Sequence, residues 1–466
     1  MNNVIHIKKG LDIPILGAAE HVVNDLAAEG CYATKPTDFV GVYARLLVAE
    51  GDSVNAGTPL IEDKNNPAAR FVSPVDGTVK SIVRGDKRKL LSVVVEACSD
   101  SSKQKKAVSP QSREEVIQAM INNGLWILLK QRPFGIIPKV RQESPNSNIT
   151  IEHQPKAVFI SLLDTSPLPV DIPFMLEGHE EDFQYGIDIL HQLTGNVHIT
   201  MGCDCNLSFS NANIHYIKGL HPAGLVGTQI ARISPINKGE TVWTVNAQDV
   251  SVIGHFFRTG EYRPERVIAI CGPVVDKPQY YRVLSGADIS EIVQRHCKRP
   301  AGRNEGDSQS LRYISGNVLS GTTITDGYIS DGCDKVSILP EGDYYDFMGW
   351  LRPNFRKFSF SRTFLSGLLN KFNIHNQNLE FDTGRHGSLR PLFVTGEFEK
   401  LTPIDIYPMQ LIKACIVGDI ELMEKLGIYE VEPEDLALCE FADTSKTEIQ
   451  SIIRNGLELI RKEVWS

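Results

Sequence analysis

The sequence predicts a multidomain protein of mixed α/β and α+β class, and three observations support this prediction. Its 466 residues exceed the usual size of a single hydrophobic core. Short apolar runs separated by glycines fill residues 38–97, which is typical of an all-β domain. From about residue 156 predicted strands alternate with helices, and from about residue 403 only helices are predicted.

The composition narrows the class of protein further. Hydrophobic residues make up 42% and charged residues 23%, as in ordinary globular proteins, and the formal net charge is −9. An acidic chain lacks the basic surface of a non-specific nucleic-acid binder, so we expect no nucleic-acid partner. Because no apolar run approaches the ~18 residues of a membrane span and MNNVIHIKKG has no signal-peptide core, we expect a cytosolic or peripheral protein.

Residues 1–100 are predicted to form an N-terminal segment followed by a β domain. Two stretches echo each other, VAEGDSVNAGTPL (48–60) and SPVDGTVKSI (73–82), and they resemble the two halves of a biotinyl/lipoyl-type hammerhead. Lys64 lies near the hairpin apex where such carriers place their modified lysine. Since the A-M-K-M flanks are missing and the gap to Ser73 is longer, we expect the fold without the modification.

Residues 101–260 are predicted to form a Rossmann-like α/β domain. A polar linker over 101–112 leads into a helix over 114–123, which ends before Gly124. Buried strands are expected at 157–163, 196–201 and 213–217, and helices at 183–193 and 248–259. This order is typical of an open parallel sheet.

Residues 261–339 are predicted to form a small β-grasp-like module of the SLBB type, with strands at 265–270 and 280–284 and a helix at 287–297. The next part, 340–402, begins with a cluster of aromatic residues and cations. Eight of the chain's 36 aromatic residues fall within 340–364, among them Trp350 and Phe355. Such a cluster fits either docking to a partner or membrane surface or a small buried core.

Residues 403–466 are predicted to be a helical C-terminal domain. Helices are expected at 408–417, 420–426 and 433–441, and Ser445-Lys446-Thr447-Glu448 reads as the capping box of a final amphipathic helix from Ile449. Ten acidic residues against two lysines give 419–448 a net charge of −8. A solvated helical face is the favoured interpretation of this charge, and an acidic docking surface is the alternative.

The most informative stretch for chemistry is the glycine-rich segment 219–227, GLHPAGLVG, which follows a predicted strand. It is neither G-x-G-x-x-G nor a P-loop, so the sequence does not support NAD or FAD binding by this chain. We expect His221 to lie on an exposed loop, with Gly224 nearby. A tight structural turn is the more common role of such a segment, and a loop that approaches a flat or phosphorylated ligand is the alternative.

Other catalytic or metal-binding patterns are missing from the sequence. The nine cysteines contain no C-x-x-C, and only Cys203 and Cys205 lie close together. The twelve histidines form no H-E-x-x-H. His191 and His198 could meet across a strand–helix contact, but packing in the core or on the surface is the more common role of such residues. We therefore expect no metal site and no catalytic residue in this chain.

Long motifs spread over nearly the whole chain resemble one protein family, the NqrA subunits of the bacterial sodium-translocating NADH:quinone oxidoreductases. They are IKKGLDIPILG (7–17), SPVDGTV (73–79), LHPAGLVGTQIARISPI (220–236), VWTVNAQDVSVIGHFFRTGEYRPERVIAICGP (242–273), SGNVLSGT (315–322), LPEGDYYDFMGWLRP (339–353) and IDIYPMQLIKACIVGDIELMEKLGIYEVEPEDLALCEF (404–441).

The resemblance implies a peripheral subunit on the cytoplasmic side of the inner membrane, within a six-subunit redox pump for Na⁺. It implies that FAD, FMN and 2Fe-2S centres belong to partner subunits, that this chain holds no cofactor, and that quinone is the substrate at its end of the complex. The candidate quinone or partner contacts are then His221, Gly224, Trp350 and Phe355. A purely structural scaffold that binds no small molecule is the alternative.

Overall fold

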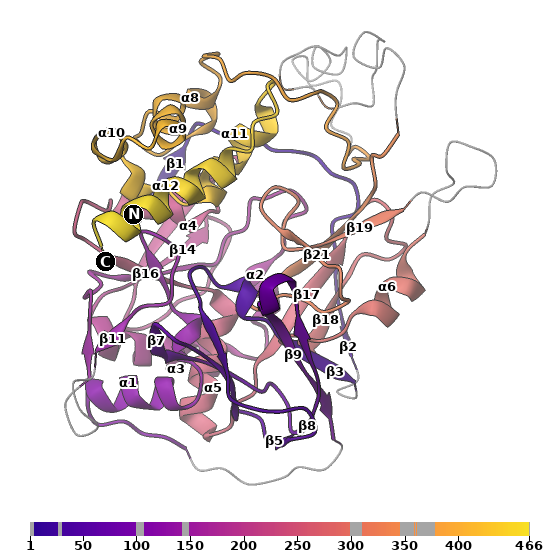
Figure 1. Ribbon diagram of the computed structural model, residues 1–466, viewed down its shortest axis with the longest axis vertical. Coiled ribbons are helices and arrows are strands. Elements are labelled where there is room, and N and C mark those ends of the chain that lie inside the picture. Colours follow the sequence, from indigo (N-terminus) through magenta and orange to yellow (C-terminus); the bar gives the residue numbers. More distant parts are fainter. Residues whose placement is uncertain are drawn as a thin grey trace.

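The computed structural model describes residues 4–26, 30–98, 107–141, 149–298, 310–344, 358, 360 and 378–465 (Figure 1). Trp350 and Phe355 lie outside these residues. In the described part of the chain, no helix is both long enough and apolar enough to cross a membrane.

The N-terminal β domain consists of two small sheets that share one core. Their inward-facing side chains, such as Leu60, Phe71 and Val93, are almost fully buried, and all three belong to the short apolar runs of residues 38–97. One sheet has the order β3-β9-β8-β5 and the other β4-β6-β7. The strands are β3 (Cys31–Thr34), β4 (Ala44–Leu46), β5 (Ser53–Val54), β6 (Pro59–Asp63), β7 (Asn66–Val72), β8 (Gly77–Arg84) and β9 (Leu90–Ala97).

The second domain is built on a six-stranded sheet with the order β1-β15-β14-β13-β16-β10, in which β10 is antiparallel and the other strands are parallel. The predicted Rossmann-like open sheet is confirmed, but the sheet is mixed and not fully parallel, because β10 pairs with β16 in the antiparallel direction. Its strands are β1 (Val4–Ile7), β10 (Lys130–Arg132), β13 (Val158–Ser161), β14 (Val197–Gly202), β15 (Asn213–Gly219) and β16 (Val242–Val245). Its helices are α1 (Arg113–Asn122), α2 (Ile172–Met175), α3 (Glu180–Thr194), α4 (Val226–Ile233) and α5 (Ala247–Thr259), and a short hairpin pairs β11 (Val140–Arg141) with β12 (Thr150–Ile151).

The third domain has its own mixed sheet with the order β2-β18-β17-β21-β19-β20. The helix α6 (Ser290–His296) follows the β17–β18 hairpin, close to the range predicted for it. The strands are β2 (Glu20–Asp25), β17 (Glu265–Cys271), β18 (Gln279–Leu284), β19 (Leu311–Ser315), β20 (Thr322–Thr323) and β21 (Lys335–Pro340).

The first 25 residues take part in two sheets outside the N-terminal β domain. Strand β1 pairs with β15 at the edge of the second sheet, and β2 pairs with β18 at the edge of the third. Local pattern gives no sign of this, because an edge strand finds its partner far away in the sequence. The division at residues 100, 260, 339 and 402 stays a proposal, with the first segment shared between sheets.

The C-terminal helices pack around a separate core that includes Leu411, Leu436 and Ile453. They are α8 (Phe398–Leu401), α9 (Pro408–Val417), α10 (Ile420–Lys425), α11 (Ala437–Ala442) and α12 (Ile449–Glu463). The predicted capping box before α12 is wrong. No side-chain cap forms at Glu448. Instead, Asp443 accepts the backbone N–H groups of Ser445 and Thr447. The Ser445 N–H is therefore not free to bond the Glu448 side chain, as a capping box requires.

Candidate functional site

The topology of the second sheet defines where a ligand of an open α/β sheet would bind. The chain runs from β13 to β14 on one side, and later returns to add β16 on the other side of β13. The direction of strand order therefore reverses between β13 and β16. Such sheets bind ligands in the crevice outside the carboxyl ends of the two strands that flank this switch point.

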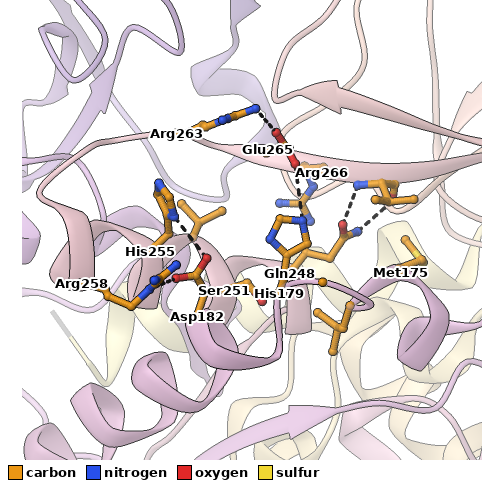
Figure 2. A pocket seen from close by; sticks show the side chains of 14 residues that line it. Met175, His179, Asp182, Gln248, Ser251, His255, Arg258, Arg263, Glu265 and Arg266 are labelled. Atoms are coloured by element: carbon orange, nitrogen blue, oxygen red, sulfur yellow. Dashed lines mark hydrogen bonds and ion pairs between the residues drawn. The ribbon is translucent and has the colours of Figure 1, made fainter. Parts of the chain in front are cut away.

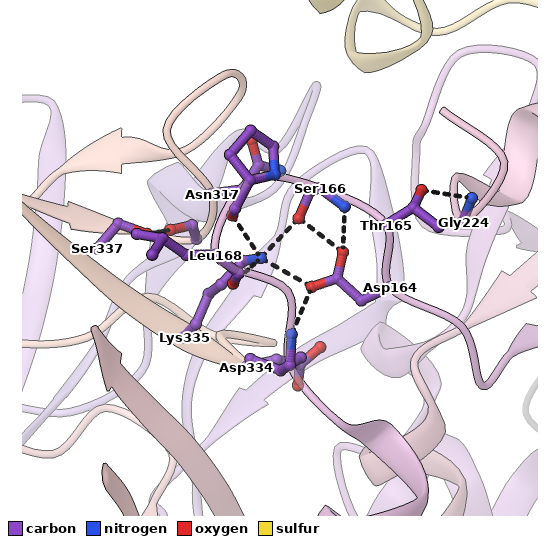
Figure 3. Close-up of polar contacts among 12 residues, drawn as sticks. Asp164, Thr165, Ser166, Leu168, Gly224, Asn317, Asp334, Lys335 and Ser337 are labelled. Atoms are coloured by element: carbon purple, nitrogen blue, oxygen red, sulfur yellow. Dashed lines mark hydrogen bonds and ion pairs between the residues drawn. The ribbon is translucent and has the colours of Figure 1, made fainter. Parts of the chain in front are cut away.

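A buried lysine from the third domain lies at this place and contacts the loop that follows β13 (Figure 3). Lys335, at the start of β21, is 4% exposed. Its Nζ lies 2.7 Å from Asp164 Oδ2 and 2.6 Å from Ser166 Oγ. It also lies 3.2 Å from the carbonyl oxygen of Pro167 and 3.0 Å from that of Leu168. All four acceptors belong to the loop that follows β13, so one ammonium group holds that loop in place.

The residue next to this lysine contacts the other flank of the crevice. Asp334 Oδ1 accepts a 2.8 Å hydrogen bond from Gln248 Nε2, and its other oxygen accepts one from the Asn246 amide, directly after β16. We call Asp164, Ser166, Asn246, Asp334 and Lys335 the Lys335 cluster. Because this cluster hydrogen-bonds to the loops after both strands, the chain's own side chains occupy the crevice.

Asp164 stays charged in this cluster. Burial alone would raise the pKa of this carboxyl group, but the charge of Lys335 and the hydrogen bonds from Lys335 and Ser166 outweigh burial and lower it. A buried carboxylate and a buried ammonium group thus compensate each other, which is the arrangement that makes such a pair tolerable away from water.

The segment 219–227 lies beside this cluster, and the expectation that His221 sits on an exposed loop is wrong. His221 is 3% exposed, and its Nδ1 lies 3.3 Å from Thr165 Oγ1. Its backbone N–H donates to Asp12 Oδ1, and its carbonyl oxygen accepts from Leu11. Burial lowers the pKa of His221 to about 4, so the imidazole is neutral at pH 7.

Gly224 is packed just as closely. Its N–H donates to Thr165 Oγ1 at 2.8 Å, and a Cβ at this position would lie 2.6 Å from Thr165 N and 2.7 Å from the carbonyl oxygen of Leu163. A side chain cannot fit there without moving backbone. The contacts agree with a tight structural turn, while a ligand contact at His221 or Gly224 stays a prediction.

A cavity of about 160 Å³ lies nearby, where the second domain meets the third (Figure 2). We call it the α3–α5 cavity, because one wall is the start of α3 and another is one face of α5. The third wall is the beginning of β17. Its apolar lining consists of Met175, Leu176, Val252 and Val267, all buried.

Close contact between α3 and α5 places the polar side chains of this cavity. A Cβ on Gly254 would lie 1.7 Å from the carbonyl oxygen of Asp182, and one on Gly186 would lie 2.1 Å from that of Val250. The two helix backbones touch at these glycines. As a result, Asp182 on α3 reaches His255 and Arg258 on α5.

Charged groups around the cavity are paired with one another. Asp182 accepts a 2.7 Å hydrogen bond from Arg258 Nε, and its other oxygen lies 3.1 Å from His255 Nδ1. Glu265 pairs with Arg263 and lies 3.4 Å from His179 Nε2, and the hydrogen bond from His179 lowers the pKa of Glu265.

Two buried polar atoms of the cavity residues have no hydrogen-bond partner among the described residues. They are Ser251 Oγ and His255 Nε2, one helical turn apart on α5. Ser251 is 8% exposed. Since buried polar atoms are nearly always paired, these two are exceptions in the described part of the chain.

Sequence reasoning missed both of these places. Lys335 follows an aspartate in a stretch that looks like any short strand, and Ser251 and His255 fall on a helix whose apolar face was recognised. The available signal was a set of residues at helical spacing on one face of the helix, namely Gln248, Ser251, Val252 and His255. Only the packing of α3 and β17 shows that this face borders a cavity.

The remaining residues that the sequence singled out lie apart from both places. Lys64 is exposed in the turn between β6 and β7, the position expected for a carrier lysine, and its modification stays untested. Cys203 is exposed. No group of three or more metal-ligating side chains occurs in the described ranges. His198 Nδ1 lies 2.9 Å from His215 Nε2 on the adjacent strand, and a contact of His198 with His191 stays untested.

The fold and these sites define a class: a multidomain protein that joins a barrel-sandwich hybrid to a mixed α/β sheet with a filled crevice, an SLBB-type domain and C-terminal helices. Family models match the NqrA N-terminal barrel-sandwich hybrid domain over residues 5–98, the NqrA second alpha/beta domain over 111–262, and the NQRA C-terminal domain over 267–326.

Full-length relatives identify the family. The chain is 36% identical over 472 residues to the NqrA subunit of the Na(+)-translocating NADH-quinone reductase of Haemophilus influenzae (strain PittGG), covering 99% of this chain and 100% of the relative. It is 35% identical over 474 residues to that of Rhodopirellula baltica, covering 99% of each. The chain therefore belongs to the NqrA family of the Na⁺-translocating NADH-quinone reductases, and is one component of an oxidoreductase complex.

A solved structure with a partial overlap is that of a NAD⁺-reducing [NiFe]-hydrogenase in the air-oxidized state. The identity is 12%, the TM-score 0.30, and the overlap covers 66% of this chain and 55% of the hydrogenase chain. This overlap carries no argument about function.

Proposed function

We propose that this chain is the cytoplasmic-side, peripheral subunit that serves the quinone-binding and quinone-reducing end of a six-subunit Na⁺ pump of the inner membrane. FAD, FMN, the 2Fe-2S centre and the Na⁺ path then belong to partner subunits, and the chain itself carries no cofactor. Relatives of the chain are named as subunits of an NADH-quinone reductase that transports Na⁺, which supplies the overall reaction.

The observation that carries this proposal is the filled crevice of the α/β sheet. In an open sheet the crevice between β13 and β16 is the place for a dinucleotide or flavin. Here Lys335 and Asp334 hydrogen-bond to Asp164 and Asn246, which lie in the segments that follow β13 and β16. This arrangement favours a subunit that leaves NADH oxidation to its partners and acts at the other end of the electron path.

The proposal also names residues that would contact the quinone or a partner subunit. Trp350 and Phe355, in the aromatic and basic segment 340–402, are proposed to meet a partner subunit or the quinone. His221 and Gly224 keep that candidate role only if the loop around them opens, because both are held by contacts within the chain.

The test is a reconstitution of the complex with and without this chain. We expect electron transfer from NADH to a quinone to be lost without the chain, while transfer from NADH to ferricyanide, which accepts electrons upstream, is retained. Equal loss of both activities would contradict a role at the quinone end. Quinone KM and turnover that stay unchanged in both His221→Ala and Trp350→Ala would remove those two residues from the proposal.

The alternative is a structural scaffold that binds no small molecule. It is favoured by ion pairs that join distant parts of the chain, such as the buried pair of Arg132 with Asp435 and the half-exposed pair of Arg132 with Glu434, both carboxylates lying in the C-terminal domain. A scaffold predicts lost assembly of the complex when the chain is absent and no saturable quinone binding by the chain alone. Modification of Lys64, a third possibility, would raise the intact mass above 51.7 kDa.

A further inference from the structure

A cysteine, a lysine and a glutamate meet across three neighbouring strands of the N-terminal β domain. Cys31 begins β3, Lys80 lies on β8, and Glu96 lies on β9 between them. Lys80 Nζ lies 3.4 Å from Cys31 Sγ and 2.7 Å from Glu96 Oε1. The sheet thus places a thiol and a carboxylate within contact distance of the same amine.

An irregularity in β8 accounts for this contact. The register between β8 and β9 shifts at Lys80, between Val79 and Ser81. A β-bulge of this kind re-aims the side chain of its extra residue. Cys31 pairs with Glu96 on the opposite side of β9, so the Lys80 amine reaches over a whole strand to the thiol. An ordinary exposed ion pair between Lys80 and Glu96 needs no such contact with sulfur.

Solvent reaches this group of side chains. The side chain of Lys80 is 50% exposed and that of Glu96 is 57% exposed. Cys31 is a free cysteine and is partly exposed beside them. A small oxidant such as hydrogen peroxide can attack a partly exposed thiol, in contrast to a buried one such as that of Cys271.

We propose that Cys31 and Lys80 form a covalent sulfur–nitrogen bridge when a peroxide oxidises the thiol. Peroxide first converts the thiol to a sulfenic acid: the sulfur gains one oxygen atom, and the peroxide is reduced to water. The Lys80 nitrogen then attacks this sulfur. The S–N bond forms as the S–O bond breaks, and the hydroxyl group leaves with one amine hydrogen as water. The bridged pair has lost one hydrogen atom from sulfur and one from nitrogen.

Glu96 is the base for the second step. The hydrogen bonds to Glu96, and next to Cys31, raise the pKa of Lys80, so the resting amine carries a proton and does not attack sulfur. The Glu96 carboxylate lies 2.7 Å from this nitrogen and takes the extra proton as the bond forms. Contact between the two reacting groups favours the condensation, because it replaces an encounter in solution.

The bridge joins strands that do not pair with each other, since β9 lies between β3 and β8. Strand β3 also holds the third domain, where the Ala33 N–H donates to the carbonyl oxygen of Gly286 at 2.8 Å. Cys31 and Lys80 are 49 residues apart, so a bond between them closes a long loop and restricts the unfolded chain. The bridged chain should therefore melt at a higher temperature than the reduced chain.

The test uses the purified full chain, which is reduced, transferred to thiol-free buffer and treated with hydrogen peroxide. Trypsin does not cut at Lys35, which precedes a proline, or at a bridged Lys80. Mass spectrometry should therefore find peptide 10–45, whose only cysteine is Cys31, joined to peptide 71–84 with the loss of two hydrogen atoms. An excess of dithiothreitol should separate the two peptides again.

Lys80→Arg is the decisive variant, because arginine keeps the positive charge and the hydrogen-bond donors but lacks the amine. Peptide 10–45 should then take up oxygen without a crosslink, and peroxide should no longer raise the melting temperature. Lys89→Arg, at an exposed lysine of the same domain, is the matched control and should form the bridge like the wild type. Glu96→Gln should slow bridge formation by at least about tenfold, since it removes the base.

The outcomes decide the proposal. Crosslinked peptides in the wild type and in Lys89→Arg, with none in Lys80→Arg, support the bridge. Oxygen uptake at Cys31 without a link to Lys80 overturns it, and so does a Cys31 thiol that stays reduced while the exposed Cys98 is oxidised. A link that retains an oxygen atom between sulfur and nitrogen overturns the condensation step. Circular dichroism shows whether each variant is folded.

Discussion

The Lys335 cluster and the α3–α5 cavity lie at the same junction between the second and third domains, and they use their polar groups in opposite ways. In the cluster, the Lys335 ammonium group has four acceptors within 3.2 Å. In the cavity, Ser251 Oγ and His255 Nε2 are buried with no partner among the described residues. A saturated buried site holds domains together, whereas an unpaired buried polar atom costs stability.

The largest expected effect tests the saturated side of this comparison. Lys335→Met leaves the buried Asp164 carboxylate without its counter-charge, and we expect a loss of about 3–5 kcal/mol in the free energy of unfolding, measured by chemical denaturation. Lys400→Met is the control, since Lys400 and Glu397 form an exposed pair worth less than about 1 kcal/mol.

A double variant shows whether the lost charge is the cause. Asp164→Asn with Lys335→Met removes both charges, and we expect it to be more stable than Lys335→Met alone. If Lys335→Met were as stable as the wild type, the crevice would be open to solvent or ligand, and the contrast with the cavity would fail.

The next effect concerns the packing of the loop beside the cluster. Gly224→Ala would place a Cβ within 2.7 Å of two backbone atoms, and we expect a loss of about 1–3 kcal/mol in stability. The control is Gly202→Ala, where the nearest atom lies 3.6 Å from the new Cβ. Equal stability of the two variants in thermal melts would mean that the loop yields easily, which would favour its role as a ligand loop.

The third prediction is a pH dependence that originates from His221. Its pKa is about 4 in the folded chain, below the ordinary value of about 6.5 in the unfolded chain. As pH falls from about 6.5 to about 4, only the unfolded chain takes up the proton, so stability is lost across this range.

His221→Asn should therefore lose less stability on acidification than the wild type, when both are compared by denaturant midpoints between about pH 7 and about pH 4. His6→Asn, at an exposed position of β1, provides the control and should follow the wild type. Parallel curves for His221→Asn and the wild type would show that His221 is accessible to water in the folded chain, contrary to its burial.

The smallest effect tests the unsaturated side. Ser251→Ala removes a buried hydroxyl group that has no partner among the described residues, so we expect the ligand-free chain to be as stable as the wild type or more stable by up to about 1 kcal/mol. Thermal melts of the ligand-free chain measure this. A clear loss of stability would mean that Ser251 Oγ is already satisfied, and the comparison between cluster and cavity would lose its basis.

Local patterns in the sequence predicted most of the secondary structure. The helix over 408–417 and the one beginning at Ile449 were found because apolar spacing and the following glycine or dipole partner are local signals. The capping box at Ser445 failed because Asp443, two residues earlier, accepts the Ser445 backbone N–H, which the Glu448 side chain would accept in a capping box. The long motifs along the chain were enough to identify the family, which the full-length relatives confirmed.

The sequence by itself therefore determined the class of each domain, most helices and strands, and the family. Only the tertiary structure decided where β1 and β2 pair, that His221 is buried, and that Lys335 enters the crevice of another domain's sheet. The reason is physical: helix and strand periodicity depends on residues within a few positions. Burial, ion pairing and cavities depend on which surfaces meet across separations such as the 171 residues between Asp164 and Lys335.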